Sequence, residues 1–192
     1  MKKTNMMTKM TTIGIDYSLT CPAVCVYNGS FENSKFYYVT TKRKYEGVFL
    51  GNITGHSYKD YNDDIERYKN LSDMVLHIIE ANQTQIKVIF LEGYSFGSKG
   101  RAIFNIAENG GILKYRLKMA HGCNIEIVPP ANIKKFATGK GNADKEKMYD
   151  QFYEDTGVNL MEALDQTTLS SPVTDIVDSY YIAKYGTENT KS

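Results

Sequence analysis

The sequence predicts an α/β fold, built on a mixed central β-sheet that is flanked by helices. Three short β-rich segments follow one another near the N-terminus, which indicates an antiparallel three-strand meander. Two later apolar strands alternate with long helical segments, a pattern typical of crossovers between parallel strands. The 192 residues contain no linker, internal repeat or low-complexity segment. We therefore expect one domain that spans residues 1–192.

The meander is predicted from residues 11–41. Residues 11–17 alternate apolar and polar side chains with β-branched residues, and this first strand ends at Asp16. Residues 23–27 and 36–41 are two further β-rich runs, separated by a glycine-containing turn. Residues 42–63 contain several glycines and lysines, and we expect them to form an irregular loop inserted into the domain.

The second half of the chain alternates strands and helices. A near-continuous apolar run, 86–91, predicts a strand buried on both faces and ending at Glu92, and 124–128 predicts another strand. Gly110 and Gly111 interrupt one predicted helix, which implies a kink or the close approach of another backbone. Helices are expected at 64–81, 102–121, 131–137, 143–156 and from Pro172 to about Tyr185.

The charge is unevenly distributed although its net value is only +1. Residues 99–147 hold ten Lys or Arg and four acids, a net +6, whereas the remainder carries −5. A basic central segment in an otherwise acidic chain indicates a localised phosphate-binding surface, although solvent-exposed helix faces give the same pattern. The candidate DNA-binding cations in this segment are Arg101, Lys134, Lys135, Lys140 and Lys145.

The three cysteines do not suggest a disulfide framework or a zinc site. We expect Cys21 and Cys25 to be buried as small apolar side chains. The N-terminal segment lacks a signal-peptide pattern, and no run approaches the roughly 20 apolar residues of a membrane span. These features predict a cytoplasmic protein with no membrane partner.

Four acids form the most informative pattern. Asp16 and Glu92 each close an apolar strand, where burial of a charge is costly unless the charge is paired or bound to a metal. Asp175 and Asp178 lie three residues apart on one face of the last helix, where like charges repel unless they share a cation. Each acid alone could be a turn, cap or surface residue. Together they predict a site for Mg²⁺, and two such ions about 3.5–4 Å apart can hydrolyse a phosphodiester.

Four segments resemble the RuvC family of Holliday junction resolvases, in the order that the family has them. They are Ile13-Gly14-Ile15-Asp16, the run 91–96, the basic segment from Ile133 to Lys145 and the acidic helix segment 174–179. The resemblance covers most of the chain outside about 42–63. It identifies the protein as similar to a divergent or phage-type member of that family, in a bacterial cell or a phage-infected host.

The resemblance implies a ribonuclease-H-like fold, a homodimer and symmetric nicking of four-way or branched DNA. It implies two Mg²⁺ ions per site, with Mn²⁺ as a substitute, held by Asp16, Glu92, Asp175 and Asp178. Lys134 and Lys145 would contact phosphates of the scissile strand, and Lys145 would also stabilise the charge that develops there. Phe96 or Tyr94 would stack on unpaired bases, although core packing explains Phe96 equally well.

The sequence departs from the family pattern at two places near these motifs. Tyr17-Ser18-Leu19 stands where the family has a glycine-containing turn, and Glu92 and Phe96 are one residue further apart than expected. A nuclease with relaxed preference among branched DNAs, or one that cuts RNA–DNA hybrids, is compatible with these departures.

Two further classes remain as alternatives. A sugar-kinase or actin-like ATPase fragment would need a second phosphate-binding motif, which is not evident, so we expect no nucleotide cofactor. A non-catalytic DNA-junction-binding module would gain nothing from four acids beside phosphate. The acids therefore favour an enzyme, and the resemblance to the RuvC family implies that this enzyme is a crossover junction endodeoxyribonuclease.

Overall fold

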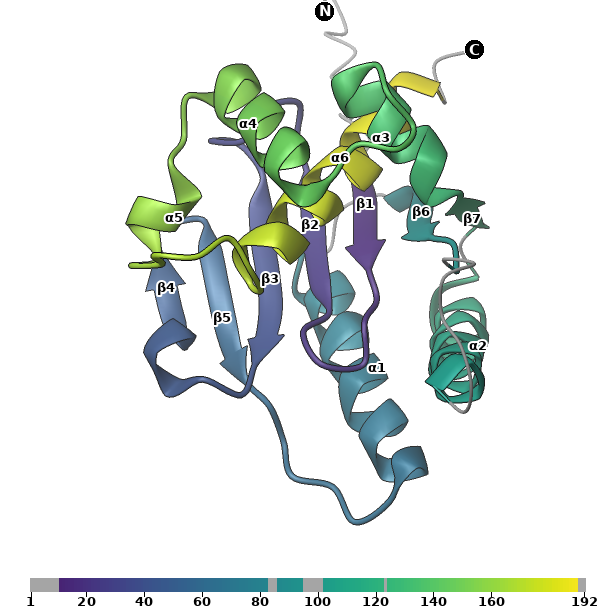
Figure 1. Cartoon of the computed structure of the whole chain (residues 1–192). Coiled ribbons are helices and arrows are strands. Elements are labelled where there is room, and N and C mark those ends of the chain that lie inside the picture. Colours follow the sequence, from purple (N-terminus) through teal and green to yellow (C-terminus); the bar gives the residue numbers. More distant parts are fainter. Residues whose placement is uncertain (1–10, 83–85, 95–101, 123, 190–192) are drawn as a thin grey trace, which may run out of the picture.

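The structure is a computed structural model that describes residues 11–82, 86–94, 102–122 and 124–189. A seven-stranded mixed sheet forms its centre, in the order β4-β5-β3-β2-β1-β6-β7 (Figure 1). The strands are β1 (Thr11–Asp16), β2 (Ala23–Tyr27), β3 (Lys35–Thr40), β4 (Gly47–Phe49), β5 (Ile53–Ser57), β6 (Ile86–Glu92) and β7 (Asn124–Val128).

The predicted meander and the predicted parallel strands are both present. β1 pairs antiparallel with β2, and β2 pairs antiparallel with β3. On the other side of β1, β6 runs parallel to β1 and β7 runs parallel to β6. Strands β1, β3, β5, β6 and β7 therefore all end at the same edge of the sheet, because β3 also runs parallel to β5.

The expectation of an irregular loop at 42–63 is wrong for half of that segment. It contains a short 3-10 helix, η1 (Arg43–Tyr45), and a hairpin of β4 and β5 that extends the sheet beyond β3. The strands are three and five residues long, and the turn between them places Leu50 and Gly51 at positive φ. Strands this short have little local signal, and pairing with β3 stabilises them instead.

The helices form two layers, one on each face of the sheet (Figure 1). The face covered by α6 also carries α3, α4 and α5, and its core is rich in tyrosine and phenylalanine. The opposite face packs against α1 and α2 through aliphatic residues. The helices are α1 (Asp64–Ala81), α2 (Ala102–His121), α3 (Pro130–Thr138), α4 (Lys145–Thr156), α5 (Leu160–Ala163) and α6 (Val173–Asn189).

Most predicted helices lie within a few residues of their expected bounds, and only the four-residue α5 was not expected. Cys21 and Cys25 are both buried, as predicted. Within the described ranges, no helix combines the length and the hydropathy that crossing a membrane would require.

Glycine lets α6 lie directly on β1. A Cβ atom at Gly14 would collide with the backbone of Ser179 and Ala183 in α6. The pair Gly110-Gly111 does not break α2, which is continuous across it. Instead, a Cβ at Gly110 would lie 2.9 Å from the hydroxyl of Tyr94, so the glycine accommodates a close side chain.

Candidate active site

The sheet brings the two strand-terminal acids together. Ile15 of β1 is the register partner of Leu91 of β6, so the next residues, Asp16 and Glu92, lie side by side at the edge where these strands end. Because α6 packs on β1 through Gly14, the beginning of that helix lies over the same edge. This placement brings Asp175 and Asp178 to the strand-terminal pair, as the sequence predicted.

Burial and mutual repulsion make the four acids difficult to ionise together. The pKa of Asp16 lies well above its ordinary value, because the carboxyl is desolvated and because Asp175, Asp178 and Glu92 add negative charge around it. Desolvation, reinforced by Asp178, raises the pKa of Glu92 to about 7. Desolvation, reinforced by Asp175, raises the pKa of Asp178 to about 6. The four groups form one electrostatic unit.

Asp175 has the smallest solvent-exposed fraction of the four acids, 7%. Desolvation raises the pKa of its carboxyl, and hydrogen bonds from Ser171 and Cys21 oppose that rise. Its Oδ2 is buried without a hydrogen-bond partner among the described residues. A buried carboxylate oxygen with no donor needs a proton or a cation to offset the cost of desolvation.

The donor set suits a hard divalent cation. All four side chains offer oxygen, and no salt bridge within the described ranges neutralises any of them. The described side chains do not, however, contain a group of three or more that already has the spacing of a metal site. Magnesium uses few protein carboxylates and fills its other positions with water and substrate oxygens, so this acid set fits it in chemistry and charge.

Two predicted lysines lie close enough to act on the acids. Lys145 begins α4 and lowers the pKa of all four carboxyls, and Lys134 of α3 does the same for Glu92 and Asp178. Lys145 also lines a small gap with Asp178 and Thr174, where α4 meets α6. The cations on these helices therefore reach the acids.

Lys135 and Lys140 do not join this group. Both side chains are exposed, and neither is among the causes of the pKa shifts of the acids. Lys140 lines a shallow surface hollow with Lys147 instead. Their predicted contact with DNA therefore concerns the surface beyond the acids.

A hollow of about 320 Å³ opens beside the acids. Asp16 and Glu92 form one wall, and α2 forms another through Ile103, Ile106 and Gly110. Tyr94 also lines the hollow, and 46% of its surface is exposed. Its hydroxyl donates a hydrogen bond to the carbonyl oxygen of Ala107 at 3.3 Å, and the Nζ of Lys114 lies 5.5 Å from the centroid of its ring. The other predicted aromatic, Phe96, and the predicted cation Arg101 lie outside the described residues.

Sequence reasoning missed several of these neighbours. Ser171 and Cys21 contact Asp175 from loops, where no periodic pattern indicates which way a side chain points. Ile103, Ile106 and Gly110 have helical spacing on one face of α2, and that spacing was the available signal.

The order and directions of the strands, with helices on both faces of the sheet, match the ribonuclease-H-like fold of solved Holliday junction resolvases. Among solved structures, the chain is similar to RuvC of Thermus thermophilus, with 16% identity, a TM-score of 0.59 and coverage of 95% of this chain and 96% of that one. The same RuvC in complex with a Holliday junction substrate gives 16% identity, a TM-score of 0.64 and coverage of 94% and 97%.

The yeast mitochondrial Holliday junction resolvase Ydc2 is also similar, with 14% identity, a TM-score of 0.55 and coverage of 91% of this chain and 76% of that one. No protein-family model and no curated protein sequence matches the chain. The resemblance to RuvC that the motifs indicated is thus confirmed as a shared fold.

Proposed function

We propose that this protein is a metal-dependent endonuclease that hydrolyses phosphodiester bonds in branched DNA and resolves Holliday junctions. The main support is the gathering of four acids that no described salt bridge neutralises, Asp16, Glu92, Asp175 and Asp178, at one edge of the sheet. Further support comes from the fold, which is similar to that of RuvC in complex with a Holliday junction substrate.

The acids would hold divalent cations, with Mg²⁺ as the expected ion and Mn²⁺ as a substitute. When bound, such an ion neutralises phosphate charge and lowers the pKa of water, which is the chemistry that phosphodiester hydrolysis needs. The orphaned Oδ2 of Asp175 and the mutual repulsion of the four carboxyls favour this role.

Two lysines and one tyrosine of the chain would position the DNA. Lys145, which acts on all four acids, would stabilise negative charge at the scissile phosphate, and Lys134 would bind a neighbouring phosphate. Tyr94 presents an exposed ring at the mouth of the hollow beside Glu92 and would stack on an unpaired base.

Symmetric cutting of a four-way junction needs two active sites, and we propose that a second copy of the chain supplies the other. A stripe of apolar residues on α2 has no partner in the described structure: Phe104, Tyr115 and Met119 are 66, 67 and 69% exposed. Their spacing places them on one face of the helix. An exposed apolar stripe of this kind is a candidate protein interface.

The dimer is tested by sedimentation of Tyr115→Glu/Met119→Glu. The wild type should sediment as a dimer and this variant as a monomer, because two buried carboxylates would be unpaired in the interface. Val48→Glu is the matched control, since Val48 is 68% exposed on β4 at the far end of the sheet. A monomeric wild type would rule out the proposed dimer.

The activity is tested with a labelled four-way junction, a matched linear duplex and an RNA–DNA hybrid, each with Mg²⁺ or EDTA. We expect paired symmetric nicks in the junction alone, and none in EDTA. Cutting of other branched DNA as well would indicate a relaxed branched-DNA nuclease. Cleavage of the hybrid alone would make RNA the substrate, and binding without cutting would indicate a junction-binding module.

A further inference from the structure

The segment between β3 and β4 carries three consecutive cations at the edge of the sheet where the acids lie. Lys42, Arg43 and Lys44, the 42–44 triplet, are all exposed and begin the turn of η1. None of them forms a salt bridge with another described residue. One acid, Glu46, follows the triplet, so the turn keeps a net positive charge.

The register of the strands fixes where this turn lies relative to the acids. Asp16 pairs with Ala23, and Ala23 pairs with Tyr38, so the three residues form one row across β1, β2 and β3. Adjacent strands are about 4.8 Å apart, which puts β3 roughly 10 Å from β1. The chain leaves β3 at Thr40, and the Lys42 N–H donates to its Oγ1 at 3.1 Å. The triplet therefore follows directly from the edge that carries Asp16.

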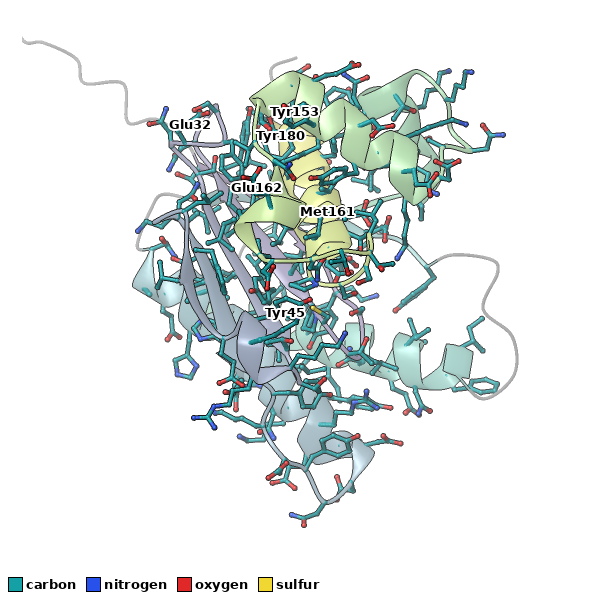
Figure 2. All side chains as sticks on the ribbon, turned by 60° about the vertical axis from the view of Figure 1, so that its left-hand side comes forward. Glu32, Tyr45, Tyr153, Met161, Glu162 and Tyr180 are labelled. Carbon is teal, nitrogen blue, oxygen red and sulfur yellow. The ribbon has the colours of Figure 1, made fainter. Side chains whose placement is uncertain are left out.

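The turn is held in place rather than free. Tyr45 is 4% exposed, its carbonyl oxygen accepts a hydrogen bond from the Tyr38 hydroxyl at 2.6 Å, and its N–H donates to the Lys42 carbonyl at 2.9 Å. Lys44 Nζ lies 4.7 Å from the centroid of the Tyr45 ring and donates to the Asp165 carbonyl at 3.4 Å. Figure 2 shows Tyr45 below Met161 and Glu162 of α5, at the lower end of the sheet.

The triplet and Lys134 of α3 lie on different sides of the acids. Lys134 acts on Glu92, at the end of β6, whereas Lys42 follows the end of β3. β6 and β3 lie on opposite sides of β1 in the sheet. A strand of DNA with its scissile phosphate at the acids would thus meet cations in both directions.

We infer that the 42–44 triplet is a second phosphate-binding element, in which Lys42 and Arg43 contact the backbone of a DNA arm and Lys44 holds the turn against Tyr45. The inference rests on the proposed function. The triplet follows Thr40, two residues past the row of Asp16, so a cation there would address a phosphate of the DNA backbone beyond the one that is cut. The segment would therefore lengthen the footprint of the protein on one arm of the junction.

The test compares two double variants in an Asp16→Asn background, which we expect to bind branched DNA without cutting it. Lys42→Ala/Arg43→Ala removes two charges from the triplet and keeps Lys44, and Lys35→Ala/Lys118→Ala removes two exposed lysines from the opposite edge of the sheet. The dissociation constant for a four-way junction is measured by fluorescence anisotropy between 50 and 300 mM salt. Each lost phosphate contact should reduce the slope of log affinity against log salt by about 0.9.

We expect Lys42→Ala/Arg43→Ala to reduce the slope by about 1.8 and to weaken binding by roughly tenfold near physiological salt, while the control stays within error of its parent. The charge-conserving variant Lys42→Arg/Arg43→Lys should bind like the parent. An unchanged slope, or an equal loss in the control, would overturn the inference while leaving the nuclease proposal intact. If the Asp16→Asn parent bound no branched DNA, the proposed function would fail and this inference with it.

Discussion

At the scale of the residue, Asp16 is the centre of the site. It alone among the four acids has its pKa raised by the charges of all the other three, after the larger effect of its own desolvation. Lys145 is the cation that lowers it. The negative charge at Asp16 is therefore the one most dependent on a bound cation.

Asp16→Asn should abolish cleavage and preserve binding. The amide keeps the shape of the side chain but removes the charge, so we expect a loss of about a thousandfold or more in single-turnover rate, equivalent to roughly 4 kcal/mol of barrier. Junction affinity in EDTA should stay the same or increase, because one negative charge near phosphate is gone. Glu80→Gln, an exposed acid at the end of α1, is the control and should cut at the wild-type rate. Undiminished cutting by Asp16→Asn would rule out this active site.

Substitutions of Lys145 and Lys140 should affect different steps, the cleavage rate for Lys145 and DNA affinity for Lys140. Lys145 acts on the acids and Lys140 does not, although both are exposed. We expect Lys145→Ala to lower the maximal single-turnover rate by about a hundredfold, the size of effect found when one donor to a developing charge is removed. Lys140→Ala should leave that rate unchanged and only weaken affinity. Equal behaviour of the two variants in a rate-against-concentration series would mean that Lys145 has no role at the scissile phosphate.

At the scale of the element, the long periodic segments were predictable and the short paired ones were not. Both α1 and α2 have the bounds expected from the sequence, where the spacing of apolar residues predicted α1, and the acid-terminated runs predicted β1 and β6. The hairpin of β4 and β5 was missed because its strands depend on pairing with β3 rather than on a local pattern.

In the candidate site, too, the sequence pattern predicted some features, and others depend on how the chain folds. The strand ends predicted that Asp16 and Glu92 meet, because parallel strands end at one edge. The contacts of Cys21 and Ser171 with Asp175 come from loops, and only the folded chain reveals them. Lys42 and its neighbours were treated as part of a loop for the same reason.

Gly14→Ala should test whether the packing of α6 on β1 assembles the site. The new methyl group would meet the backbone of Ser179 and Ala183, which cannot move without displacing the helix that carries Asp175 and Asp178. We expect a loss of about 1–3 kcal/mol in the free energy of unfolding by urea. Cleavage in Mg²⁺ should fall by far more than the folded fraction does. Wild-type stability would show that α6 does not lie against β1 in this way.

At the scale of the whole molecule, the fold places its positive charge around a negative centre. The acids occupy one edge of the sheet, with Lys134 and Lys145 near them on one layer and the 42–44 triplet beyond β3. This arrangement stores unfavourable energy in the cation-free protein, since four carboxyls repel one another where solvent is scarce. Stability should therefore depend on both pH and divalent cation.

The sign of the pH effect follows from the raised pKa values. In the unfolded chain the carboxyls have their ordinary pKa near 4, whereas in the folded protein the pKa is about 6 for Asp178 and about 7 for Glu92. Between these pH values the folded protein binds more protons than the unfolded chain. Stability from this source is thus full below about pH 4 and is lost as pH rises through about 7. In EDTA, we expect the melting temperature to fall from pH 5 to pH 8 by several degrees, at roughly 2–4 °C per kcal/mol.

Two comparisons assign that fall to the four acids. Asp16→Asn should melt at a higher temperature than the wild type in EDTA at pH 8 and should show a shallower dependence on pH, since one of the repelling charges is gone. Adding Mg²⁺ should raise the melting temperature of the wild type at pH 8 and have less effect at pH 5, where protons compete for the same oxygens. If the wild type instead gained stability from pH 5 to pH 8 in EDTA, the carboxyls would have to be ionised without mutual repulsion, and the edge of the sheet would not be the place where a cation binds.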